Sequence, residues 1–263
     1  MLVDTHIHLD CYKPEELDDL ITRAKKANVK ALITQGTNHE SNKKSLEIAK
    51  KYDIVHVAMG LYPLDAINVK NNTDYTSRQV NISVEETLDF IKKNKDKIVA
   101  IGEVGIDLKH STDLKTQTDN FSKIIELAEK LKKPLIIHSR KAENEVLELL
   151  QSYNVKKIQL HVFEGRKKEI QKAADLGYYF SIPCIINKLV HFQMLTQMVN
   201  ISQLLTETDG PWLSPYKEKQ NEPIYIQETI NHIAKIKKLD PKEVENIIYM
   251  NFQKLFRVPS NTP

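Results

Sequence analysis

Short apolar runs alternate with longer amphipathic stretches along almost the whole chain. The apolar runs lie at residues 2–9, 29–33, 54–59, 98–104, 134–138, 158–161, 178–182 and 203–206. Continuous apolar runs of this length, bounded by polar or turn-forming residues, are typical of buried parallel strands. Between them the apolar positions recur every three or four residues, as in residues 121–131, which predicts helices with one buried face. The pattern therefore predicts eight strand–helix units.

Eight such units in 263 residues favour an α/β fold, a closed (β/α)8 TIM barrel, as a single domain over residues 1–263. The alternative is an open, doubly wound sheet, which usually has a glycine-rich phosphate-binding turn after its first strand. This sequence has no such turn there. Two polar stretches interrupt the pattern, Asn68–Asn81 and Tyr216–Glu222. Loops that follow strands lie at the catalytic mouth of a barrel, so these two are either substrate-binding loops or tolerated insertions.

The composition is that of an ordinary globular domain and changes this prediction little. Hydrophobic residues make up 41% and charged residues 28% of the chain, and the formal net charge of +3 does not by itself indicate a nucleic-acid partner. The two cysteines, Cys11 and Cys184, have no metal-binding spacing, which fits a reducing compartment. No leader peptide precedes the first strand and no apolar stretch approaches about 18 residues, so we expect a cytoplasmic protein without a membrane segment. Nothing in the sequence indicates a protein partner.

The first apolar run contains a histidine pair, His6 and His8. Side chains two residues apart in a strand point to the same side, so both imidazoles are expected to converge on one point. Asp4 and Asp10 are expected to project from that same face. Neutral imidazoles beside carboxylates suit a divalent metal ion, although a pair of this kind also occurs by chance on an edge strand.

Single polar residues also end several later apolar runs. Together with the histidine pair they place four histidines and two carboxylates at one rim of the predicted barrel: His6, His8, Glu103, His138, His161 and Asp209. Six ligands exceed the needs of one tetrahedral ion and fit two ions that share a carboxylate. We assign His6, His8 and Asp209 to one ion and His138 and His161 to the other, with Glu103 between them. These ligand types accept Zn, Mn, Mg, Co or Ni, so the identity of the metal stays open.

The motifs around these residues resemble those of the TatD family of metal-dependent deoxyribonucleases, which are TIM barrels of the amidohydrolase superfamily. The resemblance covers nearly the whole chain and rests on Asp4–Leu9, Gly102–Asp107, Ile137–Arg140, His161–Gly165, Glu207–Pro211, Asn221–Pro223 and Asn251–Phe256. It implies one or two divalent metal ions and hydrolysis of DNA phosphodiester bonds, often as an exonuclease from the 3′ end, with single-stranded DNA as the expected partner. The sequence departs from the family pattern at Tyr62, where a histidine is usual, and at Leu64.

The predicted mechanism uses a metal-activated water. Asp209 is expected to ligate one ion, orient the water and accept its proton, and Glu103 is expected to bridge the ions. For the substrate we expect Arg140 to contact a phosphate, the Tyr62 hydroxyl to hydrogen-bond a phosphate oxygen, and Trp212 to stack on a base. An ion pair for Arg140 and loop packing for Trp212 are equally compatible with the sequence.

Two other functions are compatible with the same residues. A metal-dependent amidohydrolase or esterase acting on a small molecule or an aminoacyl-tRNA ester has the same ligand set, and the change at Tyr62 keeps this alternative open. The second is a metal-binding protein without activity. Asp209 argues against it, because a protein that only binds metal has no need for a catalytic carboxylate.

Overall fold

The computed structural model describes residues 1–67 and 83–258, which contain one sheet of eight parallel strands. The strands follow one another in the sheet in chain order: β1 (Leu2–Ile7), β2 (Val29–Gln35), β3 (Val55–Met59), β4 (Ala100–Asp107), β5 (Leu135–Arg140), β6 (Ile158–Leu160), β7 (Tyr179–Pro183) and β8 (Leu204–Glu207). Every strand overlaps the apolar run that predicts it. The first strand is shorter than predicted and ends at Ile7, so His8 lies just beyond it, before the 3-10 helix Leu9–Cys11.

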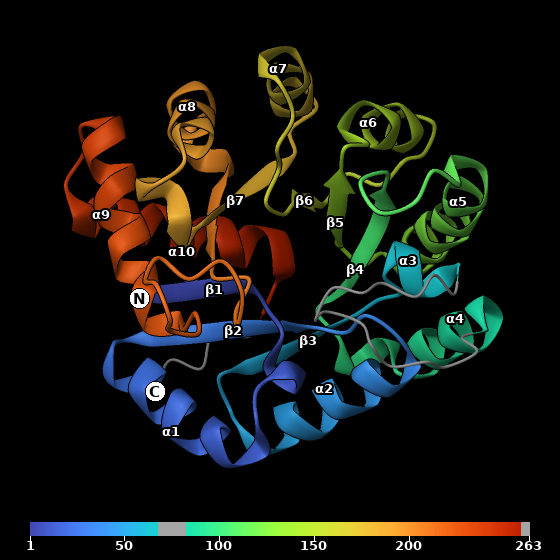
Figure 1. Cartoon of the computed structure of the whole chain (residues 1–263), viewed down its shortest axis with the longest axis horizontal. Coiled ribbons are helices and arrows are strands. Elements are labelled where there is room, and N and C mark those ends of the chain that lie inside the picture. The colour runs from blue at the N-terminus through green and yellow to red at the C-terminus, as the bar shows by residue number, and fades with distance from the viewer. Residues whose placement is uncertain (68–82, 259–263) are drawn as a thin grey trace.

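The helices lie outside the strands and surround them (Figure 1). They are α1 (Pro14–Lys26), α2 (His39–Lys51), α3 (Pro63–Ala66), α4 (Val84–Lys93), α5 (Leu114–Leu131), α6 (Glu143–Gln151), α7 (Lys167–Asp175), α8 (Val190–Met198), α9 (Ile226–Lys237) and α10 (Pro241–Phe256). This arrangement confirms the predicted (β/α)8 TIM barrel. The predicted loop at Asn68–Asn81 lies outside the described residues, and Tyr216–Glu222 is a loop, as expected.

Side-chain hydroxyls join β8 to β1, where the sheet closes on itself. Thr206 Oγ1 donates to the carbonyl oxygen of Val3 at 2.7 Å, and Thr5 Oγ1 donates to that of Thr206 at 3.0 Å. Just beyond the carboxyl end of β8, the backbone N–H of Asp209 donates to the carbonyl oxygen of His6 in β1 at 2.8 Å. These bonds fix the distance between the first and last segments of the chain that carry predicted ligands.

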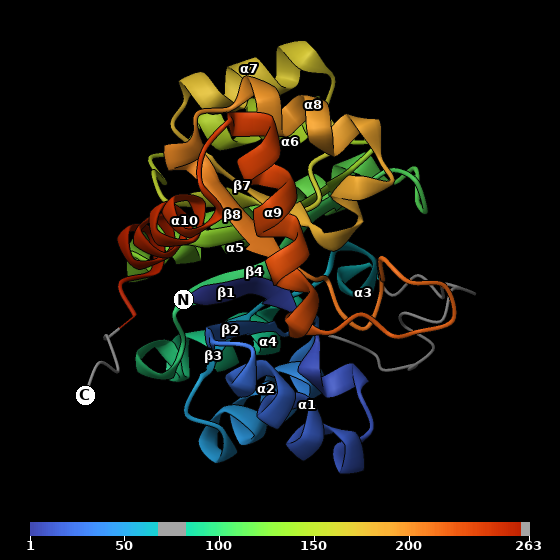
Figure 2. The same cartoon turned by 90° about the vertical axis from the view of Figure 1, so that its left-hand side faces the viewer.

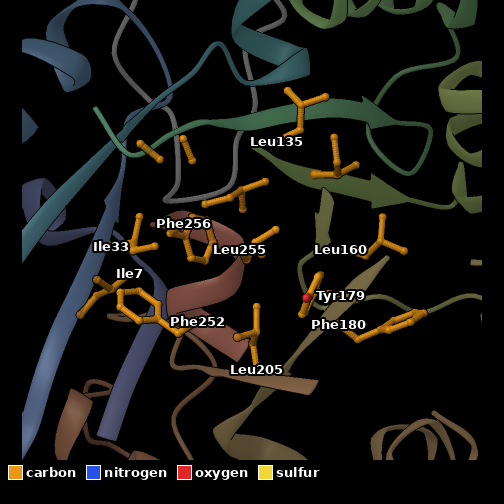
Figure 3. Close-up of a cluster of buried hydrophobic side chains, with 14 of the residues drawn as sticks. Ile7, Ile33, Leu135, Leu160, Tyr179, Phe180, Leu205, Phe252, Leu255 and Phe256 are labelled. Carbon is orange, nitrogen blue, oxygen red and sulfur yellow. The ribbon is translucent and has the colours of Figure 1, made fainter. Parts of the chain in front are cut away.

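The last helix, α10, closes the amino-terminal end of the barrel. Asn251 Nδ2 donates to the carbonyl oxygen of Leu204, the first residue of β8, at 2.8 Å. Phe252 and Phe256 are buried in the cluster that contains Leu205 of β8 (Figure 3). Figure 2 shows α10 beside the N-terminus, and α3 and the loop before α9 at the other end of the barrel. This helix therefore forms the base of the barrel, and the opposite end is free for the site.

In the described part of the chain, no helix is both long and apolar enough to cross a membrane. The cytoplasmic location, the lack of a protein partner and the single-domain boundary stay predictions from the sequence.

Candidate metal centre

His6 and His8, at the end of β1, bring their imidazole nitrogens together. The two Nε2 atoms lie 3.1 Å apart, and each is 3.5 Å from Asp209 Oδ1 in the loop after β8. Glu103 Oε2, from β4, lies 3.4 Å from His8 Nε2 and 3.7 Å from His6 Nε2. All four residues are buried. Two imidazoles and two carboxylates thus converge on one point, although they come from three distant parts of the chain.

His138 and His161 face the other oxygen of the same glutamate. His138 Nδ1, from β5, lies 2.9 Å from Glu103 Oε1, and His161 Nε2, directly after β6, lies 3.1 Å from it. Glu103 therefore lies between two groups of imidazoles, with one oxygen toward each. This is the position expected of a bridging ligand, and all six predicted ligands are brought together.

Gly105 allows β4 to approach β5 closely enough for these contacts. Its φ is +147°, and a Cβ at this position would lie 1.9 Å from the carbonyl oxygen of His138. Residues with a side chain rarely adopt this backbone conformation, and here they would also collide with β5. The glycine between Glu103 and Asp107 therefore couples the position of Glu103 to that of His138.

The residues present fit a divalent cation. His6, His8 and Glu103 offer ligand atoms that all lie within 4.8 Å of one another, and so do Glu103, His138 and His161. Asp209 Oδ1 is buried and accepts no hydrogen bond from any described residue. A buried carboxylate oxygen without a donor costs free energy, and a cation at this point would remove that cost. Nitrogen and oxygen donors of this kind are compatible with each of the ions that the sequence predicts.

The pKa of His6 is lowered, and the pKa of each of the other three imidazoles is raised. Burial, together with the charge of His161, lowers the pKa of His6 to about 3, so this imidazole is neutral and able to ligate. Burial also opposes charge at His138 and His161, but neighbouring carboxylates raise the pKa of both. These histidines hold the pKa of Glu103 well below its usual range, against the effect of burial. Metal ligation needs neutral imidazoles, so a cation bound here would compete with protons at these nitrogens.

Asp107, which the sequence analysis did not select, lies behind His138. Its Oδ2 is 3.3 Å from His138 Nε2, accepts a hydrogen bond from the Tyr62 hydroxyl at 3.0 Å, and lies 2.9 Å from His110 Nδ1. Its Oδ1 accepts hydrogen bonds from the backbone N–H groups of Lys109 and His110. A carboxylate in this position determines which imidazole nitrogen faces a metal ion. Here it leaves Nδ1 of His138 facing Glu103.

Glu207 lies behind His161 in the same way. Its Oε2 is 3.5 Å from His161 Nδ1 and accepts a hydrogen bond from the Ser181 hydroxyl at 2.6 Å. Its Oε1 accepts a hydrogen bond from the backbone N–H of Val162 at 2.9 Å. The sequence motifs contain both Asp107 and Glu207. The pattern of apolar runs does not identify their role, because that role depends on the histidines that they contact.

Asp4 and Asp10 have partners outside the two groups of imidazoles. The Thr208 hydroxyl donates to Asp4 Oδ2 at 2.6 Å, and the Ser41 hydroxyl donates to Asp10 Oδ2 at 2.8 Å. Asp4 thus positions the loop that carries Asp209, and Asp10 holds the segment after β1 against α2. The expectation that both carboxylates project from the same face as the histidine pair stays a prediction.

The metal centre opens into a cavity of about 570 Å³ at the carboxyl ends of the strands. The three predicted substrate contacts, Tyr62, Arg140 and Trp212, all line it. The centroid of the Trp212 ring lies 5.2 Å from that of His8, with the two rings nearly perpendicular, so the indole covers part of the first imidazole group. Arg140 is exposed at the end of β5. The Tyr62 hydroxyl, expected to face a phosphate, donates to Asp107.

Residues 3–257 match the model of a protein family described as TatD related DNase. The human protein Deoxyribonuclease TATDN3 is 31% identical over 262 residues, which cover 97% of this chain and 94% of that protein. An uncharacterized metal-dependent hydrolase of Methanocaldococcus jannaschii is 32% identical over 256 residues, which cover 97% of this chain and 96% of the other. The crystal structure of a TatD homologue from Escherichia coli superposes with a TM-score of 0.85 at 22% identity, covers 98% of each chain, and has the same fold.

Proposed function

Because the chain belongs to the TatD family of metal-dependent hydrolases, we propose that it removes nucleotides from the 3′ end of single-stranded DNA. The family supports metal-dependent hydrolysis of phosphodiester bonds, and the human relative is named a deoxyribonuclease. The observation that carries the proposal is the position of Glu103, whose carboxylate oxygens lie between 2.9 and 3.7 Å from nitrogens of all four histidines. Such an arrangement suits a two-metal hydrolase.

We propose that the six converging residues hold two divalent ions. His6, His8 and Asp209 would bind one ion, His138 and His161 the other, and Glu103 both. Bound there, the ions would polarise the phosphodiester and lower the pKa of water towards about 7. The contribution of the protein is orientation: Asp107 and Glu207 lie behind His138 and His161 and fix the imidazole nitrogens that face Glu103.

Asp209 is the residue that we propose accepts the proton of the attacking water. Its side chain is 13% exposed, against 2% for Glu103, and it lines the cavity. Burial opposes its charge, but His8, whose Nε2 lies 3.5 Å from Oδ1, and the charges of the other imidazoles lower its pKa, so Asp209 is ionised at neutral pH. An ionised carboxylate at the cavity wall can orient a water molecule and take its proton.

The proposed substrate contacts divide between phosphate and base. Arg140 is exposed in the cavity wall, and its planar guanidinium suits a phosphate. Trp212 lines the cavity beside His8 and offers an aromatic surface to a base. The Tyr62 hydroxyl can reach a phosphate only by giving up or sharing its bond to Asp107. We therefore propose that Tyr62 acts chiefly by holding Asp107 in place.

End-labelled single-stranded DNA tests this function. With Mg, Mn or Zn, we expect a 5′-labelled strand to shorten stepwise and a 3′-labelled strand to release a labelled mononucleotide at once. EDTA should stop both reactions. Asp209→Asn should nearly abolish turnover while keeping the fold, because the amide has the same shape but cannot accept the proton.

Three outcomes would contradict the proposal in different ways. Cleavage within the strand or from the 5′ end would contradict the exonuclease direction. Full activity of Asp209→Asn would contradict its role as proton acceptor. Hydrolysis of small esters or amides, without cleavage of DNA by protein that still holds metal, would replace the nuclease with the amidohydrolase or esterase alternative.

A further inference from the structure

The cavity above the metal centre has two unlike sides. Lys109 and Arg140, in the segments at the ends of β4 and β5, are exposed and make one side cationic. Ile185, Leu189 and Phe192, in the segment after β7, make the other side apolar. In the order of the sheet, β6 separates these two sides (Figure 1). A ligand that fits both sides must combine an anionic part with a flat or apolar part.

We propose that the apolar side is a binding site for the base of the terminal nucleotide, and that the phosphates of the following nucleotides lie along the cationic side. This inference rests on the proposed function and specifies how the strand lies in the cavity. The scissile phosphate would lie between the two sides, over Glu103. A base can lie on an apolar wall only when it is neither paired nor stacked on its neighbours, so the site favours the end of a single strand.

Glu164 supports this direction of the strand. It is exposed in the cavity wall after β6, between Arg140 and the apolar residues that follow β7. Its carboxylate repels a phosphate and so disfavours a backbone that continues past β6 onto the apolar side. An uncharged base on the apolar side avoids that repulsion. The charges lining the cavity therefore direct phosphates toward Arg140 and Lys109.

Leu189 indicates that the apolar side is more than the edge of the core. It is 40% exposed and occupies the N-cap of α8, where it forms no side-chain cap. Serine, threonine, aspartate and asparagine are preferred there, because their side chains accept a hydrogen bond from the helix backbone. A leucine here gives up a helix cap and exposes apolar surface, and a bound base would cover that surface.

The test compares two single strands of the same sequence, one with a normal 3′ nucleotide and one with a 3′ abasic residue that keeps the sugar and phosphate. For the wild-type protein we expect kcat/KM to be about tenfold lower on the abasic strand, the size of effect typical of one lost base contact. Leu189→Ser should lower kcat/KM several-fold on the normal strand and leave the abasic strand unchanged. The variant should fold, because serine is a favoured N-cap.

Leu176→Ser is the matched control. Leu176 is 37% exposed, follows α7 and does not line the cavity, so this variant should behave as the wild type on both strands. Equal kcat/KM on the two strands, for the wild type and for Leu189→Ser, would overturn the base site and leave the nuclease intact.

Binding measurements separate failure of the base site from failure of the nuclease. Fluorescence anisotropy with the same two strands, Asp209→Asn protein and Mn does not depend on turnover. We expect tighter binding of the normal strand, and loss of that preference in the double variant Asp209→Asn/Leu189→Ser. This result would support the base site even if the wild-type protein cleaved neither strand. Equal binding of the two strands to Asp209→Asn would overturn the base site whatever the activity.

Discussion

Replacement of Asp107 by asparagine should weaken one metal site and spare the other. The two oxygens of Asp107 have separate roles. Oδ1 accepts hydrogen bonds from the backbone N–H groups of Lys109 at 2.9 Å and His110 at 3.0 Å. An asparagine keeps an oxygen for these bonds, so the loop after β4 should keep its shape. Oδ2 is the atom next to His138, and an amide nitrogen in its place cannot accept a hydrogen bond from the imidazole.

The expected magnitude follows from the contacts of Oδ2. Three groups face this one atom, His138 Nε2 at 3.3 Å, the Tyr62 hydroxyl at 3.0 Å and His110 Nδ1 at 2.9 Å. Loss of a carboxylate behind a metal-ligating histidine typically lowers metal affinity about 10- to 100-fold, or ~1.4–2.7 kcal/mol. Tyr62→Phe removes only one of the three groups around Oδ2, so its effect should be smaller.

Calorimetric titration of metal-stripped protein with Mn or Zn measures this effect. For Asp107→Asn we expect the binding step assigned to His138 and His161 to weaken and the step assigned to His6 and His8 to stay unchanged. Asp10→Asn is the matched control, because Asp10 bonds to Ser41 outside the two imidazole groups. Unchanged affinity at both steps, or an equal loss at both with an intact fold, would refute the positioning role of Asp107.

Three further predictions concern the metal, the pH dependence of stability and the backbone. His138→Ala should remove one metal equivalent, and unchanged metal content by elemental analysis would contradict its assignment. Burial raises the pKa of Asp65 to about 6, despite the hydrogen bond from Asn38. Asp65 therefore stabilises the fold below about pH 4, and this contribution is lost as the pH rises through 6. Relative to the wild type, Asp65→Asn should therefore gain up to about 3 kcal/mol in urea unfolding between pH 4 and pH 7; a difference independent of pH would contradict this. Gly105→Ala should prevent stable folding. Gly177 also has a positive φ, +79°, but no atom lies within 4 Å of an added Cβ, so Gly177→Ala should lower the unfolding free energy by only about 1 kcal/mol. Similar melting temperatures for the two variants would refute the close contact of β4 with β5.

The barrel could be predicted because strands buried on both faces appear in the sequence as apolar runs. The prediction was least accurate where a strand becomes polar. The fourth strand was expected to end at Val104, but β4 continues to Asp107. This end of the barrel interior is lined by polar side chains, Glu103 and Asp107 among them, so an apolar pattern stops where the site begins.

The six converging residues could be predicted because each is a polar residue at the end of an apolar run. Their partners could not be predicted in this way. Whether Asp107 supports a ligand depends on which nitrogen of His138 faces Glu103. The role of Glu207 depends in the same way on which nitrogen of His161 faces Glu103. These relations arise only when strands distant in the sequence pack side by side. A sequence pattern can identify a ligand type, but the partner that orients it is a property of the fold.

The apolar side of the cavity shows the same limit at the level of the substrate. Leu189 and Phe192 look in the sequence like the buried face of a helix. Their exposed fractions are 40% and 1%, so only Phe192 behaves as core. Arg140 is likewise an ordinary surface residue until the fold places it across the cavity from the apolar wall. The residues that carry the chemistry of this barrel lie at the strand ends, where the sequence pattern is strong. The residues that determine specificity lie in the loops beyond them, where residue type alone does not distinguish a binding surface from a core.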